Sequence, residues 1–142
     1  MAKKQLRAIR KERAIRKARR SFLSFVQYCW QQQHDFIVGV HTKRICYEVD
    51  DAIEAYKNGE STYLDLEIGF RHGKSELVSR YLPAFFIGIF LKENPDVIMT
   101  GYGNDLIEGF SQDVKDIINS REYQELFPEV TLHPYRNKIS EW

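Results

Sequence analysis

Residues 67–76, which read Glu-Ile-Gly-Phe-Arg-His-Gly-Lys-Ser-Glu, constrain the fold of this chain more than any other stretch. They lie between an apolar extended run, Tyr63-Leu64-Asp65-Leu66, and a helical pattern that begins at Ser75. An extended segment, a loop with Gly-Lys-Ser and then a helix is the sequence form of a phosphate-binding loop. In such a loop, backbone N–H groups and the helix N-terminus converge on an anion. The stretch therefore predicts a site for the phosphates of a nucleotide.

The residue types in this loop suit ATP and Mg²⁺. The Lys74 ammonium can reach the terminal phosphates, and the Ser75 hydroxyl can ligate Mg²⁺. The common motif has a glycine where this chain has Ile68, and Gly69 follows one residue later. The alternative is a chance Gly-Lys-Ser at a helix start, where small residues and serine are common. We predict that the nucleotide contacts Gly69, Phe70, Arg71, His72, Gly73, Lys74, Ser75 and Glu76.

The charge of the chain is divided unevenly along its length. Residues 1–20 hold ten Lys and Arg against one acid, Glu12, a charge of +9, and because all 142 residues sum to +1, the rest carry −8. A basic arm on an acidic body is typical of proteins that contact a polyanion or an acidic partner. We expect a solvated, mobile arm rather than a fixed helix, able to contact nucleic-acid phosphates either way. Its contact residues would be Lys3, Lys4, Arg7, Arg10, Lys11, Arg13, Arg16, Lys17, Arg19 and Arg20.

Composition indicates a folded chain without a membrane span. The hydrophobic fraction of 43% and the aromatic fraction of 13% suit one modest domain with a core. No run approaches the roughly 20 apolar residues of a transmembrane helix. The basic N-terminus lacks the apolar core of a secretory signal, so the expected compartment is the cytosol. Cys29 and Cys46 are too few for a disulfide framework and are expected to be buried thiols.

Hydrophobic periodicity predicts an α/β fold. Strands are expected over 62–67 and 96–101, joined by a helix over 74–90 that Pro83 should kink or divide. Two strands with a helical crossover form a right-handed parallel βαβ unit. Further helices are expected over 21–31, 42–57 and 104–119, with a helical turn over 122–127. The expected divisions are a basic arm at 1–20, a helical segment at 21–60 and an incomplete nucleotide-binding core at 61–142.

Asp50 and Asp51 have a weaker interpretation. An apolar strand that ends in acidic residues would suit a carboxylate that holds Mg²⁺. The apolar positions around this pair keep a helical period, and the pair precedes the phosphate loop. We therefore expect both carboxylates to lie on a solvated helix face.

Seven segments together resemble a known family. In order they are Ala18-Arg-Arg-Ser-Phe-Leu-Ser-Phe-Val26, the helix starting near His41, Arg71-His-Gly-Lys-Ser-Glu-Leu-Val-Ser79, Pro83-Ala84, Thr100-Gly-Tyr-Gly-Asn-Asp-Leu106, Phe110-Ser111 and Glu122-Tyr-Gln-Glu-Leu-Phe-Pro128. This order is similar to the N-terminal part of the large terminase subunit of tailed bacteriophages and prophages, an ATP-driven motor that packages DNA. The family's loop commonly reads Pro-Pro-Arg-His-Gly-Lys-Ser, whereas Gly69 and Phe70 replace the prolines here.

The resemblance implies a RecA-like α/β ATPase domain joined to a C-terminal nuclease domain. It implies that Lys74 and Ser75 bind phosphate and Mg²⁺. Arg71 would stabilise charge on the transferred phosphoryl group, or else be a solvated loop cation. His72 is expected to be structural, and Tyr102 is expected to pack. The implied partners are double-stranded DNA, the small terminase subunit and the portal protein, in the cytoplasm of a bacterial host and away from membranes.

Two parts of the family's chemistry are missing from the pattern. After residue 101 no apolar strand ends in an acidic pair, and no cluster of acids suits a two-metal nuclease. We therefore expect a fragment, a truncated prophage remnant or the first part of a split gene. The alternative function is a non-catalytic interaction protein that binds nucleic acid through its basic arm. A small-molecule kinase with the same loop is disfavoured by the long helical segment before the loop.

Overall fold

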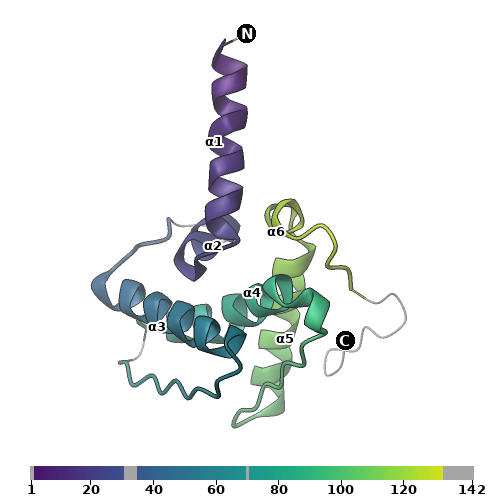
Figure 1. Cartoon of the computed structure of the whole chain (residues 1–142). Helices are drawn as coiled ribbons and strands as arrows, with labels where there is room; N and C mark the ends of the chain where they lie inside the picture. The colour runs from purple at the N-terminus through teal and green to yellow at the C-terminus, as the bar shows by residue number, and fades with distance from the viewer. Residues whose placement is uncertain (1, 31–34, 70, 133–142) are drawn as a thin grey trace. The chain divides into compact units, whose positions relative to one another are not determined.

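The computed structural model describes residues 2–30, 35–69 and 71–132, and every regular element in these ranges is a helix (Figure 1). The chain forms two compact units, Met1–Lys74 and Ser75–Trp142. The three-part division at residues 20 and 60 stays a prediction. Within the described ranges, no helix is both long enough and apolar enough to cross a membrane.

The first unit contains α1 (Ala2–Ala18), α2 (Phe22–Cys29) and α3 (Val40–Lys57), and α2 packs against both α1 and α3. The helices predicted over 21–31 and 42–57 are confirmed. Their apolar residues recur at helical spacing, so each helix presents one stripe to a shared core. The core side chains in α2 and α3 are Phe22, Phe25, Val26, Cys29, Ile45, Cys46, Val49 and Ile53.

Helix α3 ends where a glycine permits it. Gly59 has φ +78, a left-handed conformation that suits glycine. The backbone N–H of Gly59 donates to the Tyr56 carbonyl, and that of Glu60 donates to the Ala55 carbonyl, both at 3.0 Å. This pair of hydrogen bonds is a Schellman motif, which satisfies carbonyls that the last helical turn leaves without partners.

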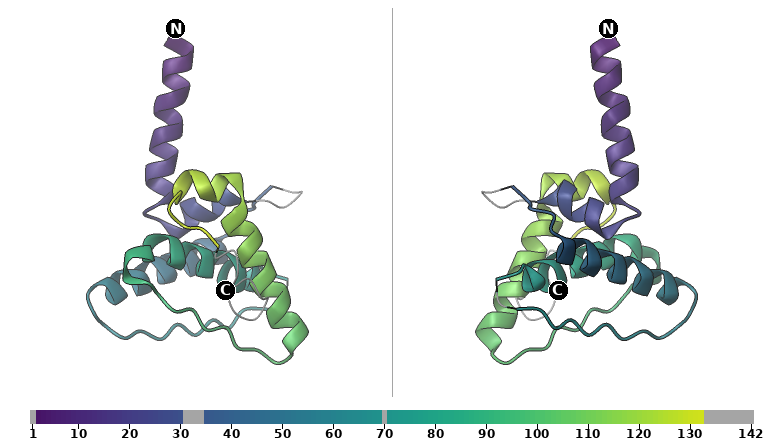
Figure 2. Two further views of the ribbon diagram at one scale, coloured as in Figure 1. Left: turned by 90° about the vertical axis from the view of Figure 1, so that its right-hand side faces the viewer. Right: turned by 90° about the vertical axis from the view of Figure 1, so that its left-hand side faces the viewer.

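The basic arm is helical over Ala2–Ala18, where a mobile terminus was expected. Residues 3–14 are all exposed, and only Ala18, at the junction with α2, is fully buried. Figures 1 and 2 show the N-terminal turns of α1 extending away from α2 and α3. The helix therefore depends mainly on its own backbone hydrogen bonds and on alanine-rich, straight-chain composition.

The second unit consists of η1 (Glu76–Tyr81), α4 (Leu82–Ile89), η2 (Leu91–Glu93), α5 (Asn104–Asn119) and α6 (Arg121–Leu126). The helices predicted over 104–119 and 122–127 are confirmed. The division expected at Pro83 is also present, because η1 is a π-helix that gives way to α4 beside this proline. Proline lacks the N–H that a regular α-turn needs, and such local widening accommodates the loss.

Packing in the second unit joins α4, α5 and α6. The Tyr123 hydroxyl donates to the Ala84 carbonyl at 2.9 Å, and both residues are fully buried. Gly88 lies so close to the Phe127 ring that an added Cβ would come within 2.6 Å of it. A glycine in α4 thus allows the ring to approach the helix backbone.

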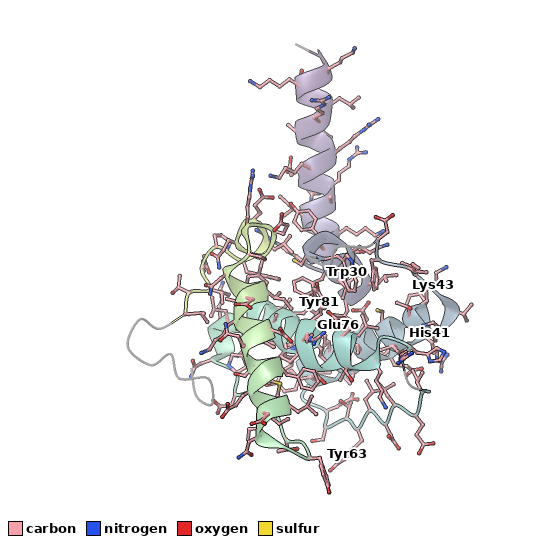
Figure 3. The ribbon with its side chains drawn as sticks, turned by 180° about the vertical axis from the view of Figure 1, so that it is seen from behind. Trp30, His41, Lys43, Tyr63, Glu76 and Tyr81 are labelled. Atoms are coloured by element: carbon pink, nitrogen blue, oxygen red, sulfur yellow. The ribbon has the colours of Figure 1, made fainter. Side chains whose placement is uncertain are left out.

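The α/β prediction, including the RecA-like core with parallel strands, is wrong: within the described residues there is no strand and no sheet. Segments 62–67 and 96–101 are irregular and carry exposed apolar side chains. Tyr63 is 101% exposed and points away from the ribbon in Figure 3, and Ile98 is 86% exposed. Composition suited to a strand is not sufficient, because a strand exists only when its backbone pairs with another.

Candidate functional site

The backbone of the predicted loop has an unusual order of dihedral angles. Arg71 has φ +65 and Gly73 has φ +76. Among the described non-glycine residues, positive φ occurs elsewhere only at Asn94, so His72 between them has negative φ. Lys74 and Ser75 are already helical, and Ser75 has φ −65 and ψ −35. Alternating signs of φ turn successive N–H groups toward one side, which forms an anion-binding concavity called a nest.

The two positive φ angles differ in backbone strain. Gly73 adopts its angle without strain, and no atom lies within 4 Å of the Cβ that another residue would add there. Arg71 carries a side chain, so its left-handed backbone is a less populated conformation. Such conformations persist only where the surrounding structure maintains them, and they are concentrated at ligand sites.

Lys74 lies half-buried beside the extended segment that precedes the loop. Its Nζ donates to the Leu66 carbonyl at 3.4 Å, a long distance for such a bond. A neutral carbonyl is a weaker partner for an ammonium group than a phosphate oxygen. Lys74 can therefore exchange this contact for an anion that enters the loop. Arg71 and Ser75 are both exposed, so their side chains are accessible to the same anion.

The His72 ring contacts the backbone of its own loop. Its Nδ1 lies 3.1 Å from the Gly69 carbonyl oxygen, and because a carbonyl only accepts, Nδ1 carries the proton. The ring also lies at the edge of the His41 ring, with centroids 5.4 Å apart and planes at 85°. The contact with His41 was missed by sequence analysis, since the two residues lie in segments far apart in the chain.

The Glu76 carboxylate contacts Arg80 within the second unit. The contact is a short ion pair with the Arg80 guanidinium, one turn along η1. Arg80 Nε lies 2.6 Å from Asp113 Oδ2, and the guanidinium covers the Phe110 ring at 5.5 Å. The Nε–H is not aligned for a hydrogen bond, so the contact with Asp113 is coulombic. These contacts join η1 to α5 and engage the Glu76 carboxylate. Phe70 lies outside the described residues.

The donor set around the loop fits phosphate better than a bare metal ion. Within the described residues, no group of three or more His, Cys, Asp or Glu could hold a metal. The Ser75 hydroxyl is a suitable Mg²⁺ ligand, but it is a single oxygen. Mg²⁺ usually keeps several waters and binds through one or two protein ligands plus substrate phosphates. The loop could thus hold Mg²⁺ only together with a nucleotide.

The predicted nucleic-acid contacts lie along α1 and just beyond it. Lys3, Lys4, Arg7, Arg10, Lys11, Arg13, Arg16 and Lys17 belong to α1, and Arg19 and Arg20 follow it; all ten are exposed. With 3.6 residues per turn these positions fall on every face of the helix. Arg16 pairs with Glu12 at 3.3 Å, and both side chains are largely exposed, so this pair neutralises little of the charge.

Asp50 departs from the expected solvated helix face. Its Oδ1 accepts a hydrogen bond from the Phe22 N–H at 2.7 Å, and its side chain is half-buried, whereas Asp51 is exposed. Burial raises the pKa of Asp50, and hydrogen bonds from Phe22 and Ser21 oppose this rise. Burial, with a contribution from Asp50, raises the pKa of the Cys46 thiol to about 12. Cys29 and Cys46 are both buried free thiols, as predicted.

Tyr102 does not pack as expected, because it is 106% exposed on an irregular segment. The resemblance to terminase stays a prediction: no family model matches the chain, and neither a curated protein nor a solved structure shows significant similarity to it.

Proposed function

We propose that residues 69–75 bind the phosphates of ATP, and that the chain is the ATP-binding N-terminal part of a terminase large subunit that powers viral DNA packaging. The observation that carries the proposal is the backbone of the loop. Positive φ at Arg71 and Gly73 leads directly into the helical residues Lys74 and Ser75. Nested N–H groups and a helix N-terminus attract the same anion, and Lys74 adds a full positive charge.

The proposal concerns binding of the nucleotide rather than hydrolysis. When bound, Mg²⁺ would neutralise charge on the phosphates, and Ser75 is the loop residue that would hold it. Hydrolysis by enzymes of this kind also requires a residue that orients the attacking water. Residues 69–75 contain no carboxylate. The proposed setting is the cytoplasm of a bacterial host, with the small terminase subunit and the portal protein as partners.

Binding of a fluorescent ATP analogue with Mg²⁺ tests this proposal. Lys74→Ala should weaken binding by about tenfold or more, because it removes a charge-assisted contact. Gly73→Ala should also weaken binding, since alanine disfavours φ +76 while meeting no neighbouring atom. Lys92→Ala is the matched control, an exposed lysine outside the loop. A folded wild-type chain that does not bind, or that binds as well after Lys74→Ala, would contradict the proposal.

A second candidate function is binding of double-stranded DNA by α1. The observation that favours it is the exposure of every cation on this helix, which is continuous over Ala2–Ala18. Lys and Arg contacts to phosphates release condensed counterions and require no particular base sequence. An exposed basic helix can therefore bind the DNA backbone whether or not the loop binds a nucleotide.

Salt dependence identifies this activity. Changing Arg7, Arg10, Arg13 and Lys17 together to Gln should weaken binding to a DNA duplex at low salt. If all four contact phosphates, the slope of log K against log salt should become shallower by roughly 3.6. A control changes Lys57 and Lys92, two cations outside the arm, and should leave the slope unchanged. Unchanged affinity and slope in the α1 variant would exclude the arm as the DNA contact.

A further inference from the structure

The start of α3 faces the phosphate loop within the first unit. His41 is the second residue of α3, and its ring meets the His72 ring edge to face at a centroid distance of 5.4 Å. Both histidines are exposed. Figure 3 shows His41 and Lys43 at the same end of α3. The contact brings a second chain segment, 39–44, to the loop.

The charge of the two segments favours an anion as the ligand between them. Together, residues 39–44 and 69–74 hold six basic side chains and no carboxylate. The six are His41, Lys43, Arg44, Arg71, His72 and Lys74. Glu48, one turn after Arg44 in α3, pairs with the Arg44 guanidinium at 2.5 Å, and Arg44 remains largely exposed. Two imidazoles alone could suggest a metal, but a surrounding excess of positive charge repels a metal cation and attracts phosphate.

The backbone at the start of α3 also favours an anion. Gly39 is the N-cap, it offers no side chain to cap the first turn, and the first turn contains no acid. The N–H groups of that turn therefore carry partial positive charge without a side-chain acceptor from the cap. A Cβ at Gly39 would lie 2.8 Å from His41 Cε1, so glycine leaves room for the ring in its observed position.

We propose that His41 is a nucleotide-binding residue of the phosphate site, which donates a hydrogen bond to the phosphate chain held by residues 71–74. This inference rests on the proposed nucleotide function and adds a second wall to the site. A loop alone contacts the phosphates from one side. A donor on α3 contacts them from another, so the site favours a chain of phosphates over a single phosphate group.

Three substitutions at His41 separate a direct contact from a packing role. His41→Ala removes both the ring and the donor. His41→Phe keeps an aromatic ring against His72 but cannot donate, and His41→Gln keeps a donor without the ring. Binding of the fluorescent ATP analogue with Mg²⁺ is measured for each, with tripolyphosphate as a competitor that carries only the phosphate chain. Lys57→Ala, at the far end of α3, is the control. Circular dichroism verifies folding of every variant.

The expected result is about tenfold weaker binding of ATP and tripolyphosphate by the Ala and Phe variants, with most of the affinity kept by Gln. If Lys74→Ala abolishes binding while His41→Ala binds like wild type, the inference about His41 fails and the loop site stands. If the Phe variant binds like wild type and Ala does not, His41 positions His72 by packing, which also overturns the direct contact. If folded wild type binds neither ligand, the proposed function and this inference both fail.

Discussion

The carboxylate of Asp50 stabilises helix α2 although Asp50 belongs to α3. Ser21, the N-cap of α2, makes no side-chain hydrogen bond to the first turn, and the Phe22 N–H instead donates to Asp50 Oδ1. An unsatisfied N–H at a buried helix start costs free energy, so a distant residue can replace the local cap. The half-buried carboxylate is disfavoured when charged, and its pKa is raised for that reason.

Substitutions at Asp50 should separate the effect of its hydrogen bond with Phe22 from the effect of burying its charge. Asp50→Ala removes the acceptor and should lower the free energy of unfolding by about 1 kcal/mol relative to Asp50→Asn, whose oxygen still accepts from Phe22. Because the folded pKa is raised, the folded chain holds the proton more tightly than the unfolded chain. Wild-type stability should therefore fall relative to Asp50→Asn as pH rises from below 3.8 through the raised pKa. Urea unfolding of both proteins across this pH range measures their free energies of unfolding. A wild-type free energy of unfolding that rises relative to that of Asp50→Asn with increasing pH would contradict the prediction.

At the scale of elements, α1 differs from the other long helices. Among the side chains of α1 that the structure describes, only Ala18 is fully buried, whereas α3 and α5 each bury one face. Isolated helices of about this length are marginal in water, and most helices in proteins depend on an amphipathic face packed on a core. The charged N-terminal turns of α1 lack such a face.

Hydrogen exchange should reveal this difference. Amides of residues 6–13 should exchange orders of magnitude faster than those of residues 46–53 in α3, because local opening of α1 exposes little apolar surface. Mass spectrometry of proteolytic fragments after timed labelling resolves the two segments. Adding duplex DNA should slow exchange in α1 if the arm binds it. Equal protection of both segments without DNA would mean that α1 is buried against another surface in solution.

At the scale of the whole molecule, the absence of a sheet among the described residues makes the extended segments accessible. Proteases bind their substrates as extended chains, and loop segments without backbone pairing are the usual sites of first cleavage. Tyr63 and Tyr102 are fully exposed on such segments, while Tyr81 and Tyr123 are buried in helical elements.

Limited digestion with chymotrypsin under native conditions tests this description. The first cuts should follow Tyr63 and Tyr102, and Tyr81 and Tyr123 should resist until the chain unfolds. Mass analysis of the early fragments identifies the cut sites, and a urea-unfolded sample provides the control in which all four are cut. Resistance at Tyr63 in the native chain would indicate that segment 62–67 is paired, as the α/β prediction required, and resistance at Tyr102 would indicate that this side chain is covered.

Features that depend on neighbours along the chain follow from the amino-acid sequence. The helices α2, α3 and α5, the glycine end at Gly59 and the division at Pro83 were predictable, because helical hydrogen bonds and caps join residues a few positions apart. The turn at Gly73 and the helix start after it were predictable for the same reason, whereas the binding of phosphate by this loop stays a prediction.

Features that join distant segments follow from packing, which the order of residues along the chain does not show. Strand-like composition at 62–67 and 96–101 could not show whether a partner backbone was present, because β pairing is non-local. The hydrogen bond from Phe22 to Asp50 and the contact between His41 and His72 likewise follow from packing of α3 in the first unit. Local periodicity fixes the period of an element and the face it can bury, whereas packing chooses which distant side chains meet there.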